Sequence, residues 1–304
     1  MAAASRTDTP DRSATRGGPP GWVLLAPLLL VLVLGARELA SRVGRDGYRD
    51  IDARRARLDP GVEWVDPRWE ADLRERLAEQ GVLGAEDAAA RDRLVAAVAQ
   101  LSFVAEVGPP AVIWPDGLRL PLRLQQPAAC VRVRDAYLPV AADGTLLAGP
   151  WPAPPRIGSA WLPVLGPLDG ALDYARAGEV LSDERHRDAL VTAQALLAAL
   201  PPADLAVLGR VLIDATGARA AAPDRPGLRL YLEDRRVVIF GRPADTVEPG
   251  ELPVELKWTA LSRALELLRP GEPELDWDLV DLRWDRPEIR RRGSAEPEAL
   301  LAGG

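Results

Sequence analysis

The feature that most constrains this chain is an uninterrupted stretch of 20 uncharged residues, Gly17–Ala36, near the N-terminus. Its length matches what an α-helix needs to cross a bilayer at about 1.5 Å per residue. The competing interpretation is a cleaved signal peptide, whose apolar region is about 7–15 residues long. No small-residue cleavage site follows this stretch, because the next residues are Arg37 and Glu38. We therefore expect a retained single transmembrane helix at 21–37.

The segments that flank this stretch differ from it in composition. Residues 1–20 are small and polar, with several prolines and no apolar period, which is typical of a disordered tail. Arginines lie on both sides of the predicted helix, so charge alone does not fix its orientation in a membrane. Residues 38–57 are expected to form a juxtamembrane linker, and the polar residues 293–304 a second disordered tail.

Composition excludes several kinds of site. The chain has one histidine (His186), one cysteine (Cys130) and one lysine (Lys257). A zinc site needs about four clustered Cys, His or carboxylate ligands, so one cysteine and one histidine cannot supply a Cys/His finger, and no disulfide can form within the chain. We expect His186 and Lys257 on the surface and Cys130 packed as a small apolar residue. The formal net charge of −7 argues against a nucleic-acid partner.

The sequence carries no recognisable catalytic or cofactor motif. It has no Gly-x-Ser-x-Gly turn, no Gly-x-x-x-x-Gly-Lys run and no Gly-x-Gly-x-x-Gly after a strand. The acidic stretch that begins at Asp276 fails as a calcium loop, because Val280 and Asp281 stand where an oxygen ligand and a glycine are required. We therefore expect no catalytic residue, no cofactor, no metal and no small-molecule substrate.

Residues 58–126 show the pattern of a small α+β domain that we expect to fold separately. Helices are predicted after Asp66-Pro67 and over about 86–101, where apolar residues recur every three or four positions. A hairpin is predicted where apolar residues alternate on either side of 115–117. With a first strand at 62–65, the order of elements is β-α-α-β-β.

Residues 127–292 are richer in strand patterns and predict a larger β domain. Asp143-Gly144 is typical of a hairpin turn. One helix is expected over about 184–200 and a last one where Trp258, Leu261 and Leu265 recur. The segment 277–284 is expected to be the terminal strand. Its alternation places three residues on one apolar face: Val280, Leu282 and Trp284.

This order of parts resembles the bacterial cell-division family FtsQ, called DivIB in Gram-positive bacteria. The Asp143-Gly144 segment, the Trp161-Leu-Pro163 that follows it and the Lys257-x-x-x-Leu261 helix are similar to parts of that family. The most specific match is Val280-Asp-Leu-Arg-Trp-Asp285, which resembles the family's Val-Asp-Leu-Arg-aromatic-Asp signature. The resemblance implies a POTRA domain at 58–126 and a β domain at 127–292. Both would lie in the periplasm, with the tail 1–20 in the cytoplasm.

The resemblance also implies what the protein does. Members of the family are non-enzymatic scaffolds of the inner membrane at the division septum. They bind the small single-span proteins FtsB and FtsL and license septal wall synthesis. The family pairs its terminal strand with a partner, so the resemblance implies these partner-binding residues: Val280, Asp281, Leu282, Arg283 and Trp284. Two alternatives stay open, a POTRA-containing assembly or secretion factor and a membrane-anchored hydrolase.

Overall fold

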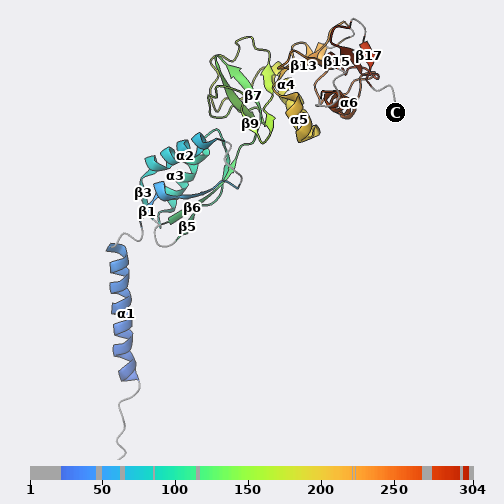
Figure 1. Ribbon diagram of the computed structural model, residues 1–304. Helices are drawn as coiled ribbons and strands as arrows, with labels where there is room; N and C mark the ends of the chain where they lie inside the picture. The colour runs from blue at the N-terminus through green and yellow to red at the C-terminus, as the bar shows by residue number, and fades with distance from the viewer. Residues whose placement is uncertain are drawn as a thin grey trace, which may run out of the picture.

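The structure is a computed structural model that describes residues 22–45, 50–61, 66–84, 86–113, 117–220, 222, 224–268, 276–294 and 297–300. It is an α+β protein, as predicted. An N-terminal helix, α1 (Trp22–Arg45), precedes a first domain that ends with strand β6 and a second domain that begins with strand β7 (Figure 1). The predicted tail at 1–20 and the predicted strand at 62–65 lie outside the described residues.

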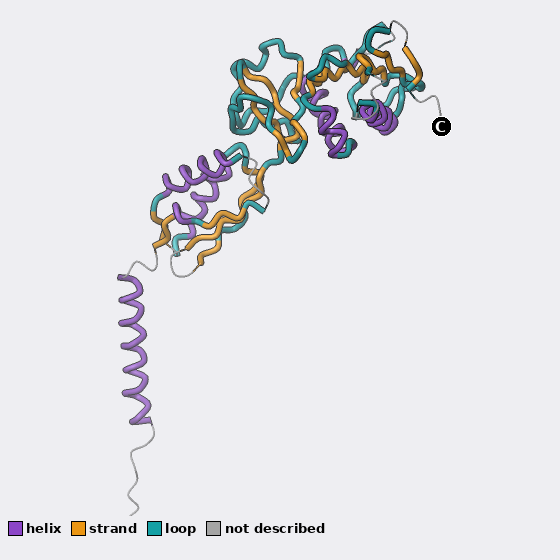
Figure 2. Tube along the Cα trace, viewed as in Figure 1, coloured by secondary structure: helices purple, strands orange, loops and turns teal. Residues whose placement is uncertain are grey.

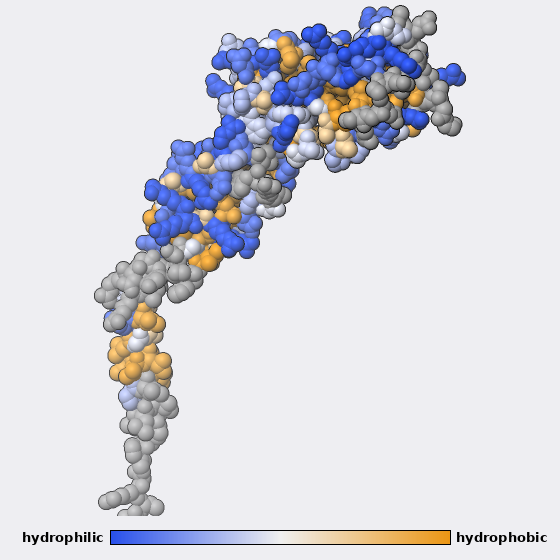
Figure 3. All heavy atoms as spheres, in the orientation of Figure 1, coloured by the Kyte–Doolittle hydropathy of each residue, from blue (hydrophilic) through white to orange (hydrophobic). Residues whose placement is uncertain are grey.

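Helix α1 corrects the prediction of a transmembrane helix. Its residues from Leu29 to Leu34 are apolar and exposed, and Figure 3 shows the apolar surface along this helix. Arg37 and Glu38 then end the apolar stretch, and charged side chains are costly inside hydrocarbon. Over the residues that the structure describes, no helix combines the length and the apolar character needed to cross a membrane. That part of the predicted fold class is therefore wrong.

The first domain contains a small sheet and a two-stranded ladder. Its strands are β1 (Asp50–Asp52), β2 (Arg57–Asp59), β3 (Val82–Gly84), β4 (Val104–Val107), β5 (Ala111–Ile113) and β6 (Gly117–Leu124). The sheet has the order β2-β6-β4, with β5 also paired to β6, and β1 pairs with β3. The antiparallel pair of β5 and β6 confirms the predicted hairpin. The domain begins at Asp50, within the predicted linker, because β1 pairs with β3 and buries Ile51.

Two helices cover this sheet, as predicted. Helix α2 (Pro67–Gln80) begins after Asp66, whose carboxylate accepts a hydrogen bond from the backbone N–H of Arg68 at 2.8 Å. Helix α3 (Ala88–Ala99) begins after Asp87, whose side chain caps its first turn in the same way. Such caps satisfy N–H groups that have no partner within the helix. Local sequence therefore determines where both helices start.

The apolar core of the first domain continues into the second domain. Trp69 of α2 stacks on Phe103 with ring centroids 4.9 Å apart, and its indole N–H donates to the carbonyl of Ala148 at 3.1 Å. Ala141 and Leu147, which belong to the second domain, are fully buried in this same cluster. The two domains thus share apolar packing, which the expectation of a separate unit at 58–126 did not include.

The second domain is built on a nine-stranded sheet with the order β17-β16-β15-β14-β13-β12-β11-β7-β8. Its strands are β7 (Pro127–Val133), β8 (Ala136–Ala141), β11 (Val164–Gly166), β12 (Val211–Asp214), β13 (Leu228–Leu232), β14 (Val237–Gly241), β15 (Trp277–Asp281), β16 (Glu288–Arg291) and β17 (Pro297–Ala299). The Pro-rich segment 149–170 contains a further short hairpin, β9 (Arg156–Ile157) and β10 (Ala160–Trp161).

Three helices accompany this sheet: α4 (Glu184–Ala199), α5 (Pro202–Leu208) and α6 (Val254–Glu266). Apolar side chains of α4 and α6 join those of the strands in one core. Figure 2 shows these helices below the strands of the sheet. The helices predicted at 184–200 and through Trp258 are therefore confirmed.

The strand predicted to be terminal lies inside the sheet. β15 pairs in parallel with β14 on one side and antiparallel with β16 on the other. β17 then pairs with β16, within the predicted disordered tail 293–304. The expectation that 277–284 is the terminal strand is therefore wrong. The sequence gives little sign of the later strands, because Ile289 is the one apolar residue in β16.

The single histidine is buried rather than on the surface. His186 of α4 is 0% exposed, and its Nε2 lies 3.3 Å from the carbonyl oxygen of Pro167. Because a carbonyl only accepts, Nε2 carries the proton in this contact. Nδ1 has no hydrogen bond and lies 3.8 Å from the carboxylate of Asp183. Burial lowers the pKa of His186, and the attraction of Asp183 offsets only part of this effect.

The shared core leads to a first prediction. Leu147→Ala should destabilise the protein by about 2–5 kcal/mol, because it leaves a cavity in packed apolar surroundings. It should also speed amide hydrogen exchange in α2, although Leu147 belongs to the second domain. Exchange is measured on the full chain by mass spectrometry. Leu165→Ala, which removes the same atoms from the other core, should leave α2 unchanged. Equal exchange in α2 for wild type and Leu147→Ala would contradict a shared core.

A second prediction concerns pH. Because the pKa of His186 is lowered on folding, the unfolded chain binds more protons below the ordinary histidine pKa of about 6.5. The stabilisation is fully present above that pH and is lost as pH falls. The free energy of unfolding, measured in urea, should therefore drop between about pH 7.5 and 5.5, and His186→Gln should drop less. The chain has one histidine, so the difference in slope belongs to this residue. Identical slopes would show that His186 is not held neutral.

Candidate functional site

The five residues predicted to contact a partner lie at the end of β15 and in the turn that follows. Val280 and Leu282 are fully buried in the core of the second domain. Asp281 and Arg283 pair with each other, with 2.7 Å between Nη2 and the carboxylate, and both are mostly buried. Trp284 is 36% exposed. Of these five residues, Trp284 is therefore the one that presents a large apolar side chain to solvent.

Backbone contacts hold Trp284 against the loop 242–253, which connects β14 to α6. Glu251 and Trp284 form an isolated antiparallel bridge. The backbone N–H of Leu252 donates to the carbonyl of Arg283 at 2.9 Å. The Arg283 guanidinium lies 5.2 Å from the centre of the Trp284 ring, within the range of a cation–π contact. The position of Trp284 thus depends on a loop that is 30 or so residues away in sequence.

A cavity of about 270 Å³ opens beside Trp284. Its wall combines two arginines, two glutamates and small or apolar residues: Ala222, Arg242, Glu248, Pro249, Glu251, Arg283 and Trp284. The volume suits one or two side chains of a partner rather than a large cofactor, since small-molecule sites are typically about 300–1,000 Å³. Opposite charges on one wall favour a polar partner segment.

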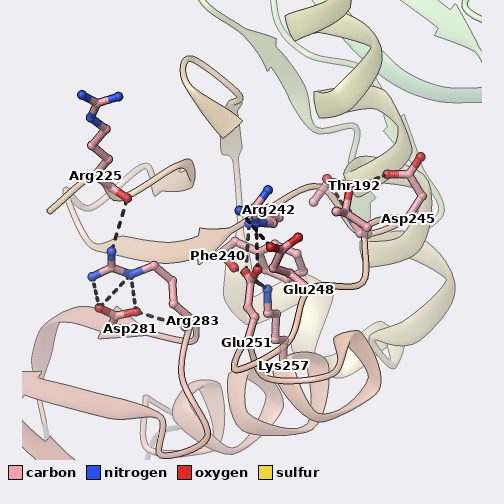
Figure 4. Close-up of polar contacts among 12 residues, drawn as sticks. Thr192, Arg225, Phe240, Arg242, Asp245, Glu248, Glu251, Lys257, Asp281 and Arg283 are labelled. Atoms are coloured by element: carbon pink, nitrogen blue, oxygen red, sulfur yellow. Dashed lines mark hydrogen bonds and ion pairs between the residues drawn. The ribbon is translucent and has the colours of Figure 1, made fainter. Parts of the chain in front are cut away.

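The single lysine lies beneath this loop rather than on the surface. Lys257 of α6 is 4% exposed, and its Nζ donates to Glu251 Oε1 at 2.6 Å and to the Phe240 carbonyl at 2.7 Å. Figure 4 shows the ammonium group between these two partners. Burial lowers the pKa of Lys257, whereas Glu251 acts in the opposite direction. The helical period indicates the burial of Lys257, because this residue stands four positions before the buried Leu261 and so lies on the same face of the helix.

Glu251 is held from three directions. Besides Lys257, its Oε1 accepts the backbone N–H of Arg242 at 3.0 Å, and its Oε2 lies 3.6 Å from Arg242 Nε. Gly241 has a φ of +92°, and a Cβ at that position would collide with Glu251 Oε1. Glycine at 241 is thus required both by its backbone conformation and by the approach of the carboxylate.

The other residues considered for chemistry lie elsewhere. Cys130 is buried with its sulfur 3.8 Å from the carbonyl of Leu162, and burial raises the pKa of its thiol. His186 contacts Pro167 and lines a separate cavity of about 390 Å³. The structure therefore does not bring Cys130, His186 and Lys257 together. Over the described residues, no group of three or more His, Cys, Asp or Glu side chains is placed to hold a metal ion.

The chain is similar to solved structures, whereas the comparisons with family models and with curated proteins give no match. Among solved structures, the chain is similar to the major extracytoplasmic domain of the cell-division protein DivIB, in its trans isomer, from Geobacillus stearothermophilus. The match has 23% identity and a TM-score of 0.21, and it covers 37% of this chain and 75% of that chain. A likeness at this level transfers no function to the chain.

Proposed function

We propose that this chain is a non-enzymatic cell-division scaffold that binds small single-span proteins of the FtsB and FtsL kind and so supports septal wall synthesis. Its folded body would act outside the cytoplasm, as the sequence resemblance implies. The observation that most supports the proposal is the exposure of Trp284. This residue stands at the aromatic position of Val280–Asp285, the segment that resembles the family signature.

The surroundings of Trp284 suit a contact point for a protein partner. Tryptophan and arginine are enriched among the residues that dominate binding energy at interfaces, and Arg283 lies against the Trp284 ring. Val280 and Leu282 anchor the preceding segment in the core, so Trp284 projects from a rigid support. The adjacent cavity offers charged groups of both signs for hydrogen bonds at the rim of an interface.

The buried state of the reactive residue types supports a non-enzymatic role. A catalytic thiol must form a thiolate and reach substrate, whereas the buried Cys130 has a raised pKa. A general base must lie within hydrogen-bond reach of the group that it deprotonates, whereas His186, although it lines a cavity, is 0% exposed and its Nε2 contacts the carbonyl of Pro167. These observations favour a binding protein over the hydrolase alternative.

The proposal predicts the effect of Trp284→Ala. Truncating an aromatic that dominates an interface costs about 2 kcal/mol, so binding should weaken about thirtyfold. The full chain would be co-expressed with the FtsB- and FtsL-like proteins of the same organism, and the co-purified amounts measured. Because Trp284 is partly exposed, the thermal midpoint should fall by only a few degrees.

Tyr174→Ala is the matched control, since Tyr174 is an exposed aromatic of the same domain away from this cavity. It should leave both co-purification and the thermal midpoint unchanged. Undiminished co-purification with Trp284→Ala would refute the proposed contact. A large loss of thermal stability would instead identify Trp284 as a core residue.

The location in the proposal has its own test. A reporter enzyme that is active only outside the cytoplasm, fused after Gly304, should be active in cells that express the full chain. A second reporter that is active only inside the cytoplasm should be silent at the same fusion point. The reverse pattern of activities would rule out the proposed location.

A further inference from the structure

We propose that Lys257 is a positioning residue for Trp284. By binding Glu251, it fixes the loop 242–253 against the backbone of Arg283 and Trp284 and so sets the orientation of the exposed indole. This inference rests on the proposed function for its consequence in binding, but its structural part stands on contacts within this chain.

The first step is the attachment of the loop to the helix and the sheet. The Lys257 ammonium has three N–H donors, and two of them bind the Glu251 carboxylate and the carbonyl of Phe240 at the end of β14. The same group lies 4.5 Å from the centre of the Phe240 ring. One side chain of α6 thus holds both the end of β14 and the far part of the loop that leaves it.

Glu251 transmits this constraint to Trp284. Glu251 is the residue whose side chain Lys257 binds and whose backbone bridges to Trp284. The next residue, Leu252, donates its N–H to the Arg283 carbonyl. The path from Lys257 to Trp284 therefore passes through a single residue, with no other flexible side chain between them.

Removal of the Lys257 cation should change the position of Glu251. Without Lys257, the mostly buried Glu251 carboxylate would keep its contacts with Arg242 and lose the cation that lies closest to it among the described contacts. A buried charge that loses its partner is strongly unfavourable, so Glu251 would turn toward solvent and take its backbone bridge with it. Val280 and Leu282 lie outside this path, packed in the core of the second domain, so the effect should be local.

The test uses the full chain with Lys257→Met and, separately, Glu251→Gln. Hydrogen exchange is followed at 249–256 and 281–286, together with co-purification of the co-expressed FtsB- and FtsL-like proteins. We expect hydrogen exchange in both segments to rise about tenfold, because the loop would open more often. Co-purification should fall about fivefold, because Lys257 acts on Trp284 through neighbouring residues and does not touch the partner itself. Ser262→Ala is the control, because it removes a hydroxyl of the same helix that binds the buried Asp204, away from the loop.

The possible outcomes separate the two proposals. If Trp284→Ala keeps full co-purification, the proposed function fails, while exchange at 281–286 still decides whether Lys257 positions this segment. If Trp284→Ala loses co-purification but Lys257→Met and Glu251→Gln keep wild-type exchange and binding, the positioning role is overturned. If Lys257→Met does not fold, Glu251→Gln decides on the same two readouts, since it preserves shape and removes only the charge.

Discussion

The parallel pairing of β14 and β15 is the constraint that the candidate site depends on. Val237 pairs with Leu279 and Val238 with Val280, and parallel strands cannot be joined by a tight turn. The chain must cross the sheet between them, and α6 supplies this crossover. Because both strands run in the same direction, the loop after β14 and the segment after β15 leave the sheet at the same edge. Glu251 and Trp284 therefore meet although the sequence separates them.

This geometry gives different roles to the residues at the end of β15 and in the turn that follows. Val280 and Leu282 complete the core under α6, so their side chains are not available to a partner. Arg283 satisfies the mostly buried Asp281, which would otherwise be an unpaired charge. Trp284 stands beyond both, supported by backbone contacts on one side and open on the other. Because the other four residues are buried or paired within the protein, this segment exposes one large side chain to solvent rather than a whole strand.

Features that depend on residues close together in the sequence were predicted correctly. Helix α2 begins where Asp66 and Pro67 indicated, and the burial of Val280 and Leu282 follows from simple alternation. Long-range features were missed. The pairing of β17 with β16 involves short strands with few apolar residues, whose partners no local pattern specifies. The contact of Leu147 with the core around Trp69 likewise joins segments that are about 80 residues apart.

The missed burial of Lys257 and His186 has a different cause. Composition treats histidine and lysine as surface residues, because a charge is costly to bury without a partner. The helical period placed each of them on an apolar face, four residues before Leu261 and Leu190 respectively. The helical period was the better indicator of burial, since each buried side chain has a backbone carbonyl as its partner. Lys257 contacts the carbonyl of Phe240 and His186 that of Pro167.

A buried ion pair is weak support for stability, because desolvation offsets much of the attraction between the charges. Apolar residues at 251 and 257 could pack as well, but they would accept many arrangements of the loop above them. The Lys257 ammonium and the Glu251 carboxylate instead require particular distances to the Phe240 carbonyl and the Arg242 N–H. Those contacts favour the arrangement of the loop that includes the bridge from Glu251 to Trp284. In the proposed positioning role, the pair would set the orientation of Trp284 rather than add much to stability.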